Sequence, residues 1–200
     1  MYSLVLAVIL GLLPMAAMAK SIVVLGDSIS AGYGIDVNAG WVNLLQQKFK
    51  ALPSDVVIHN ESISGDTTAG GLARLDPLLS RHKPAWVLVE LGANDGLRGL
   101  SPQEMKSNLT EIVKRSQKAG AKVMLLGMKI PPNYGKRYID LFYNIYPQLA
   151  DELNLPLVPF ILEDVALKPE MMQADGLHPN AVGQPLIAEK VWGYLWPLLK

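Results

Sequence analysis

A serine follows directly after an apolar run near the start of this sequence. The run 22–25 (IVVL) leads into GDSISAGYG, residues 26–34, which places Ser28 just after a glycine and an aspartate. A serine at the carboxyl end of a buried strand can present its hydroxyl to a substrate as a nucleophile. An ordinary turn explains the same letters, and Ser30 is a rival nucleophile two residues later.

A serine nucleophile needs a base, and the sequence contains three histidines: His59, His82 and His178. Asp175 precedes His178 by three residues in DGLHP, so its carboxylate can accept a hydrogen bond from Nδ1–H and leave Nε2 free to take a proton. A DG turn with an exposed histidine is the alternative. We expect His59 to end a strand and His82 to be a solvated residue at the end of a helix on the opposite edge.

Acyl transfer also requires hydrogen-bond donors for a developing oxyanion. Gly65 can offer a backbone N–H without a side chain in the way, and Asn94 can offer its side-chain amide. Each residue alone is typical of a turn. Because both follow apolar runs, we expect them on the same edge of the sheet as Ser28.

Five short apolar runs, 22–25, 56–59, 86–91, 123–128 and 157–161, alternate with longer segments of helical periodicity. Continuous apolar runs of this length predict strands that are buried on both faces of a parallel sheet. The order predicts one three-layer α/β domain, whose ligand crevice lies beyond the carboxyl ends of the strands.

The segments between the runs carry helix signals. Ser101 and Glu104 form a capping box with Pro102 at the first helical position, and apolar residues follow at helical spacing: Met105, Leu109, Ile112 and Val113. Pro77 and Pro147 lie inside two other helical patterns, which predicts that those helices are short, kinked or begin late.

Composition excludes several functions. Eighteen Lys and Arg residues balance eighteen Asp and Glu residues, so no basic field favours nucleic acid. The absence of cysteine excludes thiol catalysis, disulfides and thiolate metal sites. The acidic residues Asp27, Asp66 and Asp95 occur singly beside glycine turns, so we expect no metal and no cofactor.

Residues 1–19 contain no charged side chain and end in Ala-Met-Ala, which is typical of a secretory signal peptide. The usual Lys or Arg before the apolar stretch of a signal peptide is missing. An uncleaved membrane anchor is the alternative, because 19 uncharged residues are nearly long enough to span a bilayer. We expect cleavage after Ala19, a single mature domain 20–200 without a stable membrane anchor, and a location in a bacterial periplasm or outside the cell.

Four motifs occur in order along the mature chain: GDSI at 26–29, SISGD at 62–66, GAND at 92–95 and DGLHP at 175–179. The sequence resembles the SGNH (GDSL-type) hydrolases, and within them the small periplasmic thioesterase, lysophospholipase and arylesterase group. The only visible departure is Ile29, where the family's name has leucine.

The resemblance implies a flavodoxin-like fold with a five-stranded sheet. It implies that Ser28 is the nucleophile, that His178 is the base oriented by Asp175, and that the N–H groups of Ser28 and Gly65 form the oxyanion hole with Asn94. The implied substrates are acyl-CoA thioesters, lysophospholipids and aryl esters, and we expect a monomer. The segment 129–138 could be a flap over the acyl group or a plain loop.

Two other functions remain open, and two are disfavoured. An acetylesterase for a carbohydrate or another polar acceptor would use the same residues, and a periplasmic binding module would use the crevice without catalysis. An α/β-hydrolase is disfavoured because Ser30 replaces the last glycine of G-x-S-x-G and the serine follows the first strand. Nucleotide binding is disfavoured because neither phosphate-binding glycine motif is present.

Overall fold

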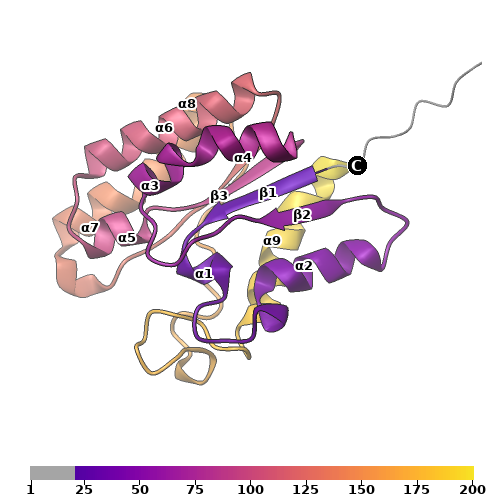
Figure 1. Cartoon of the computed structure of the whole chain (residues 1–200). Coiled ribbons are helices and arrows are strands. Elements are labelled where there is room, and N and C mark those ends of the chain that lie inside the picture. Colours follow the sequence, from indigo (N-terminus) through magenta and orange to yellow (C-terminus); the bar gives the residue numbers. More distant parts are fainter. Residues whose placement is uncertain (1–20) are drawn as a thin grey trace, which may run out of the picture.

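The computed structural model describes residues 21–200, which build a single parallel sheet with helices on both faces (Figure 1). The strand order is β2-β1-β3-β4-β5. The strands are β1 (Ser21–Gly26), β2 (Val57–Asn60), β3 (Trp86–Glu90), β4 (Lys122–Leu126) and β5 (Leu157–Val158). The predicted three-layer, five-stranded fold is confirmed. The predicted signal segment 1–19 lies outside the described residues.

Two layers of helices enclose the sheet (Figure 1). One face is covered by α2 and α9, which pack against each other, and the other mainly by α3, α4, α6 and α8. The helices are α1 (Ser28–Ala31), α2 (Trp41–Lys50), α3 (Thr68–Ala73), α4 (Leu75–His82), α5 (Ala93–Leu97), α6 (Pro102–Lys118), α7 (Lys136–Tyr143), α8 (Ile145–Leu153) and α9 (Gln184–Leu199). Short 3₁₀ turns span Val37–Ala39, Pro132–Tyr134 and Pro169–Met171.

The strands differ in burial. All of β3 and nearly all of β1 and β4 are buried, as the apolar runs predict. The prediction of burial on both faces is wrong for β2, whose residues are exposed or half-buried. This strand lies at the edge of the sheet and has only β1 as a neighbour. An apolar run predicts a strand but does not distinguish an edge from a centre.

The predicted helix start at Ser101 is confirmed, with one of the two bonds of a capping box present. Ser101 Oγ accepts a hydrogen bond from the backbone N–H of Glu104 at 3.3 Å, and the four apolar residues predicted to line α6 are buried. Pro77 and Pro147 are the third residues of α4 and α8, where a proline removes no hydrogen bond of its own helix. Both helices therefore begin late, after the short helices α3 and α7.

The direction of winding reverses between the neighbouring strands β1 and β3. In a sheet of this kind a crevice forms beyond the carboxyl ends of the two strands at the reversal. α1 follows β1 directly at this edge, and α5 follows β3. The motifs that could carry chemistry therefore meet at one place.

Candidate active site

Ser28 lies at a sharp turn from strand to helix. β1 ends at Gly26, and Ser28 is the first residue of α1. The Asp27 side chain caps this helix, because its Oδ1 accepts the backbone N–H of Ile29 at 3.0 Å. The four-residue helix ends at Gly32, whose φ of 76° is left-handed. The turn holds Ser28 at the carboxyl edge of the sheet.

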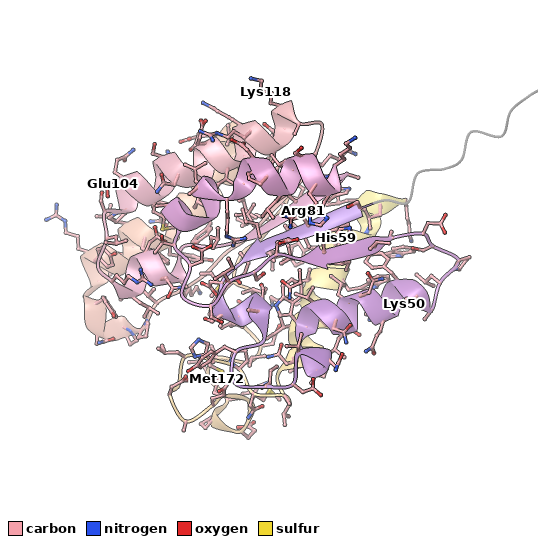
Figure 2. The ribbon with its side chains drawn as sticks, viewed as in Figure 1. Lys50, His59, Arg81, Glu104, Lys118 and Met172 are labelled. Atoms are coloured by element: carbon pink, nitrogen blue, oxygen red, sulfur yellow. The ribbon has the colours of Figure 1, made fainter. Side chains whose placement is uncertain are left out.

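His178 comes from the long loop between β5 and α9. Figure 2 labels Met172 in this loop, at the same end of the molecule as α1. Met172 forms an antiparallel bridge with Pro179, and Gln173 Nε2 donates to Tyr33 O at 2.7 Å, which ties the loop to the segment after α1. The loop thereby brings residues 150 positions away in the sequence to Ser28.

Three side chains from this edge form a continuous hydrogen-bonded chain. Asp175 Oδ2 lies 2.7 Å from His178 Nδ1, and His178 Nε2 lies 2.8 Å from Ser28 Oγ. Asp175 Oδ1 also accepts the backbone N–H groups of Leu177 at 2.9 Å and His178 at 3.0 Å. With Nδ1–H donating to Asp175, Nε2 is left to accept the Ser28 hydroxyl proton.

The aspartate of this chain is held as an anion. Burial acts to raise the pKa of Asp175, but the hydrogen bonds from His178 and Leu177 outweigh it and lower the pKa to about 2. The ring of Tyr33 lies 4.7 Å from that of His178, centroid to centroid, and covers it on one side. The imidazole is thus oriented by a charge and by packing.

The other two histidines lie away from Ser28, beside β2. His59 and His82 stack with ring centroids 4.1 Å apart, and His82 Nε2 lies 2.6 Å from Glu61 Oε1. The prediction that His82 is a solvated residue is wrong, since its side chain is only 12% exposed. The prediction that it ends a helix is confirmed, because α4 ends at His82.

Two backbone N–H groups are candidate donors to an oxyanion. Among residues 21–200, no hydrogen-bond acceptor takes the backbone N–H of Ser28 or of Gly65. Gly65 has a φ of 80°, which favours glycine, and Arg98 Nη2 donates to its carbonyl oxygen at 2.6 Å. The bond from Arg98 restrains the peptide that follows this N–H group.

The Asn94 amide lies in the same region but has protein partners. Its Nδ2 donates to Asp27 Oδ2 at 3.0 Å and to the carbonyl oxygen of Asp66 at 2.9 Å. An amide nitrogen carries two hydrogens, so both are engaged. Donation to an oxyanion would require that one acceptor share its hydrogen or give it up.

The three single aspartates of the motifs each have a structural partner. Asp66 pairs with Arg74 at 2.7 Å, and Asp95 Oδ2 accepts the backbone N–H of Thr68 at 2.9 Å. Burial raises the pKa of Asp27 to about 6, against its hydrogen bond from Ile29 and the positive charge of His178. Within the part of the chain described, no three His, Cys, Asp or Glu side chains form a cluster that could hold a metal.

A pocket of about 80 Å³ opens beside Ser28 and His178. Its other walls are mainly apolar and include Ile29, Leu97, Met128, Ile130, Leu162 and Leu177. Lys129, Ile130 and Pro131, from the segment 129–138, form part of the wall, and Tyr134 Oη donates to Leu97 O at 2.7 Å. Larger hollows of about 460 and 610 Å³ lie along α6, but neither is lined by a histidine.

Sequence reasoning did not identify four residues that support this site. They are Asp27, which binds the Asn94 amide, Arg98, which restrains the Gly65 peptide, Tyr33, which packs on His178, and Glu90, which lies buried beneath the turn. A glutamate inside the apolar run 86–91 is the one signal that could have been noticed. The other three contacts depend on how loops meet.

A doubly wound parallel sheet with a Ser–His–Asp chain at its carboxyl edge, and a serine directly after the first strand, defines the SGNH class of hydrolases. The sequence matches the GDSL-like Lipase/Acylhydrolase family over residues 24–186. This chain belongs to that family and is an ester hydrolase.

Relatives and solved structures agree with this assignment. The chain is 50% identical to Esterase TesA of Pseudomonas aeruginosa over 94% of both chains. It is 49% identical to Thioesterase 1/protease 1/lysophospholipase L1 of Escherichia coli K12, over 92% of this chain and 87% of the relative. The crystal structure of the psychrotrophic esterase EstA from Pseudoalteromonas sp., inhibited by monoethylphosphonate, matches with a TM-score of 0.87 and 47% identity over 90% of this chain and 98% of that one.

Proposed function

We propose that Ser28 attacks the carbonyl carbon of an acyl ester or thioester while its proton passes to His178 Nε2, with Asp175 stabilising the imidazolium. The oxyanion of the tetrahedral intermediate accepts hydrogen bonds from the N–H groups of Ser28 and Gly65 and from the Asn94 amide. His178 then protonates the leaving alcohol or thiol, and water releases the acyl group from Ser28 by the same route. The observation that carries this proposal is the chain from Asp175 to Ser28 Oγ, with 2.7 and 2.8 Å between its heavy atoms.

The lining of the pocket supports a substrate that is recognised by an apolar acyl group. Leu97, Ile130 and Leu177 lie beside Ser28 and His178, where the acyl chain of a covalent intermediate would start. Apolar walls favour hydrocarbon over a polar acceptor because burial of methylene groups stabilises the complex. We therefore infer activity on acyl thioesters, lysophospholipids and aryl esters, the substrate classes that the names of its relatives indicate.

Covalent labelling tests the nucleophile. A p-nitrophenyl alkylphosphonate should release one p-nitrophenol for each protein molecule and add its mass to the peptide that contains Ser28. Ser28→Ala should abolish labelling and turnover, while Ser107→Ala, an exposed serine on α6, should leave both unchanged. Labelling of Ser30, or turnover by Ser28→Ala at the wild-type rate, would contradict the assignment.

A chain-length series tests the substrate class. On p-nitrophenyl esters from acetyl to palmitoyl, kcat/KM should rise with acyl length until the apolar surface is filled. Palmitoyl-CoA and a lysophosphatidylcholine, assayed alongside, test the thioester and phospholipid activities. A maximum at acetyl would contradict the apolar acyl specificity and support the acetylesterase alternative.

We further propose that the mature chain begins at Lys20 and acts as a monomer in the periplasm or outside the cell. The charge-free segment 1–19 and its Ala-Met-Ala end support export. From Ser21 onward, no helix has the length and apolar character needed to cross a membrane. N-terminal sequencing of the protein from the periplasmic fraction should read Lys20 first, and light scattering should give the mass of one chain. An intact N-terminus in the membrane fraction would contradict both the cleavage and the location, and the mass of two or more chains would contradict the monomer.

A further inference from the structure

Glu90 is an ionisable residue on β3, the middle strand of the apolar sheet. It ends β3, directly beside Gly26 at the end of β1, and its exposed fraction is 0%. A Cβ atom at Gly26 would lie 2.8 Å from Glu90 Oε2 and from Ser30 Oγ. The glycine before the proposed nucleophile thus makes room for a buried carboxyl group.

The two oxygens of Glu90 have different surroundings. Oε2 accepts the Ser30 hydroxyl at 2.7 Å and the backbone N–H of Asp27 at 3.2 Å. Oε1 is buried and receives no hydrogen bond from any donor of residues 21–200. An orphan acceptor at such a site is costly, whereas a protonated Oε1 needs an acceptor and not a donor.

The neighbouring acid is Asp27, whose backbone N–H bonds to Glu90 Oε2 at 3.2 Å. A hydrogen bond between the two side chains lowers the pKa of Asp27 and raises that of Glu90, as donation from Glu90 to Asp27 would. Two carboxylates this close and this buried do not both ionise, so the pair retains one proton. Burial raises the pKa of both groups, and the charge of Asp27 adds to the effect on Glu90.

The hydrogen bonds around the pair assign the proton. Asp27 Oδ1 accepts from the Ile29 N–H, and Oδ2 accepts from Asn94 Nδ2. Asp27 therefore has donors at both oxygens, as a carboxylate requires, and the positive charge of His178 also favours its ionised form. Glu90 has donors at only one oxygen, which is the pattern of a neutral acid.

We propose that Glu90 is a positioning residue that is held as a neutral acid, donates a hydrogen bond to the Asp27 carboxylate, and through Asp27 fixes the amide of Asn94. Asp27 holds one hydrogen of Asn94 Nδ2, so that the other can pass from the Asp66 carbonyl oxygen to the oxyanion. The second half of this inference depends on the proposed role of Asn94, whereas the location of the proton does not.

Infrared spectroscopy locates the proton without reference to activity. At about pH 8, exposed carboxyl groups are ionised, so the C=O stretch of a protonated acid reports a buried one. The wild-type protein should show this band, and Glu90→Gln should lack it. Absence of the band from the wild type, or its persistence in Glu90→Gln, would overturn the assignment of the proton to Glu90.

Reciprocal amide substitutions test the positioning role. Gln at position 90 can accept from Ser30 and donate to Asp27 as the neutral acid does, whereas Asn at position 27 presents an amide to the Asn94 amide. We expect Asp27→Asn and Glu90→Leu to lose about tenfold or more in kcat with little change in KM. Glu90→Gln should restore most of the turnover that Glu90→Leu loses.

Two kinetic outcomes would overturn the inference. One is a loss in Glu90→Gln as large as in Glu90→Leu. The other is wild-type turnover in Asp27→Asn together with a loss in Glu90→Gln, which would place the negative charge on Glu90. If Glu90→Leu does not fold, the comparison of Asp27→Asn with Glu90→Gln still decides. Wild-type turnover in Asn94→Ala would contradict the proposed oxyanion hole but leave the infrared result standing.

Discussion

The molecule contains two histidine–carboxylate pairs with nearly the same nitrogen–oxygen distance. His178 Nδ1 lies 2.7 Å from Asp175 Oδ2 at the carboxyl edge of the sheet, and His82 Nε2 lies 2.6 Å from Glu61 Oε1 beside the edge strand β2. Figure 2 labels His59, the stacking partner of His82, on β2, whereas Met172 marks the loop of the first pair. Only the first pair has a serine hydroxyl on its second nitrogen.

The difference shows that a histidine–carboxylate pair is not by itself an acid–base catalyst. The Asp175 pair has the Ser28 hydroxyl on Nε2, and the backbone N–H of the same serine has no acceptor among residues 21–200. The ring of His82 instead packs against a second histidine, and Glu61 also lies 3.8 Å from Arg81 Nη1. The partners of the free nitrogen, and not the carboxylate, distinguish a proposed active site from a structural contact.

The largest expected effect separates the two histidines. His178→Ala should lower kcat on a p-nitrophenyl ester by about 10³-fold or more, because His178 is the only base among residues 21–200 that is hydrogen-bonded to Ser28 Oγ. His82→Ala should leave kcat unchanged and lower the free energy of unfolding by about 1 kcal/mol, since it removes a hydrogen bond to Glu61. Steady-state kinetics and urea unfolding measure both effects. Comparable losses of kcat in the two variants would break the distinction.

The second effect concerns the carboxylate. Asp175→Asn should lower kcat by about 10²- to 10⁴-fold, because the amide favours the wrong tautomer of His178. The pKa of Asp175 in the folded protein is about 2, below its ordinary value of 3.8. The ionised carboxylate therefore stabilises the fold fully above pH 3.8, and this stabilisation is lost as the pH falls towards 2. The charge of Asp175 is therefore present from about pH 5 to pH 8, and the kinetic defect should persist across this range. A defect that disappears at one end of this range would show that the charge has another role.

A third effect tests the donors that the His82 pair lacks. Asn94→Ala should lower kcat by about 10²- to 10³-fold and leave KM nearly unchanged, because its amide serves a charge that forms only in the transition state. A change confined to KM would make Asn94 a substrate-binding residue.

The sequence predicted the architecture well because it depends on local patterns. Apolar runs located all five strands, and the Ser101 cap located the start of α6. The spacing of Asp175 and His178 predicted their hydrogen bond, since three residues bring the two side chains together within one loop. The family match confirms the class of enzyme that the four motifs predicted.

The remaining features depend on contacts between distant segments. His82 is shielded by Glu61, 21 residues away, and Asp27 bonds to Glu90 across 63 residues. The hydrophobic periodicity of a sequence does not predict contacts between residues so far apart in the chain. The exposure of β2 depends on its place at the edge of the sheet, which an apolar run does not encode.

The smallest expected effect is on the pH dependence of stability near β2. Burial lowers the pKa of His59 from its ordinary 6.5, and the charge of His82 lowers it further against the charge of Glu61. The unfolded chain therefore takes up a proton at His59 near pH 6.5 while the folded chain does not, so this contribution is fully present above pH 6.5 and is lost as the pH falls through the folded pKa. His59→Gln should flatten the decline of Tm below pH 6.5 and leave kcat at neutral pH unchanged, because no contact links His59 to Ser28. An unaltered slope would show that His59 binds its proton equally in both states, and a fall in kcat would connect the two regions that the structure separates.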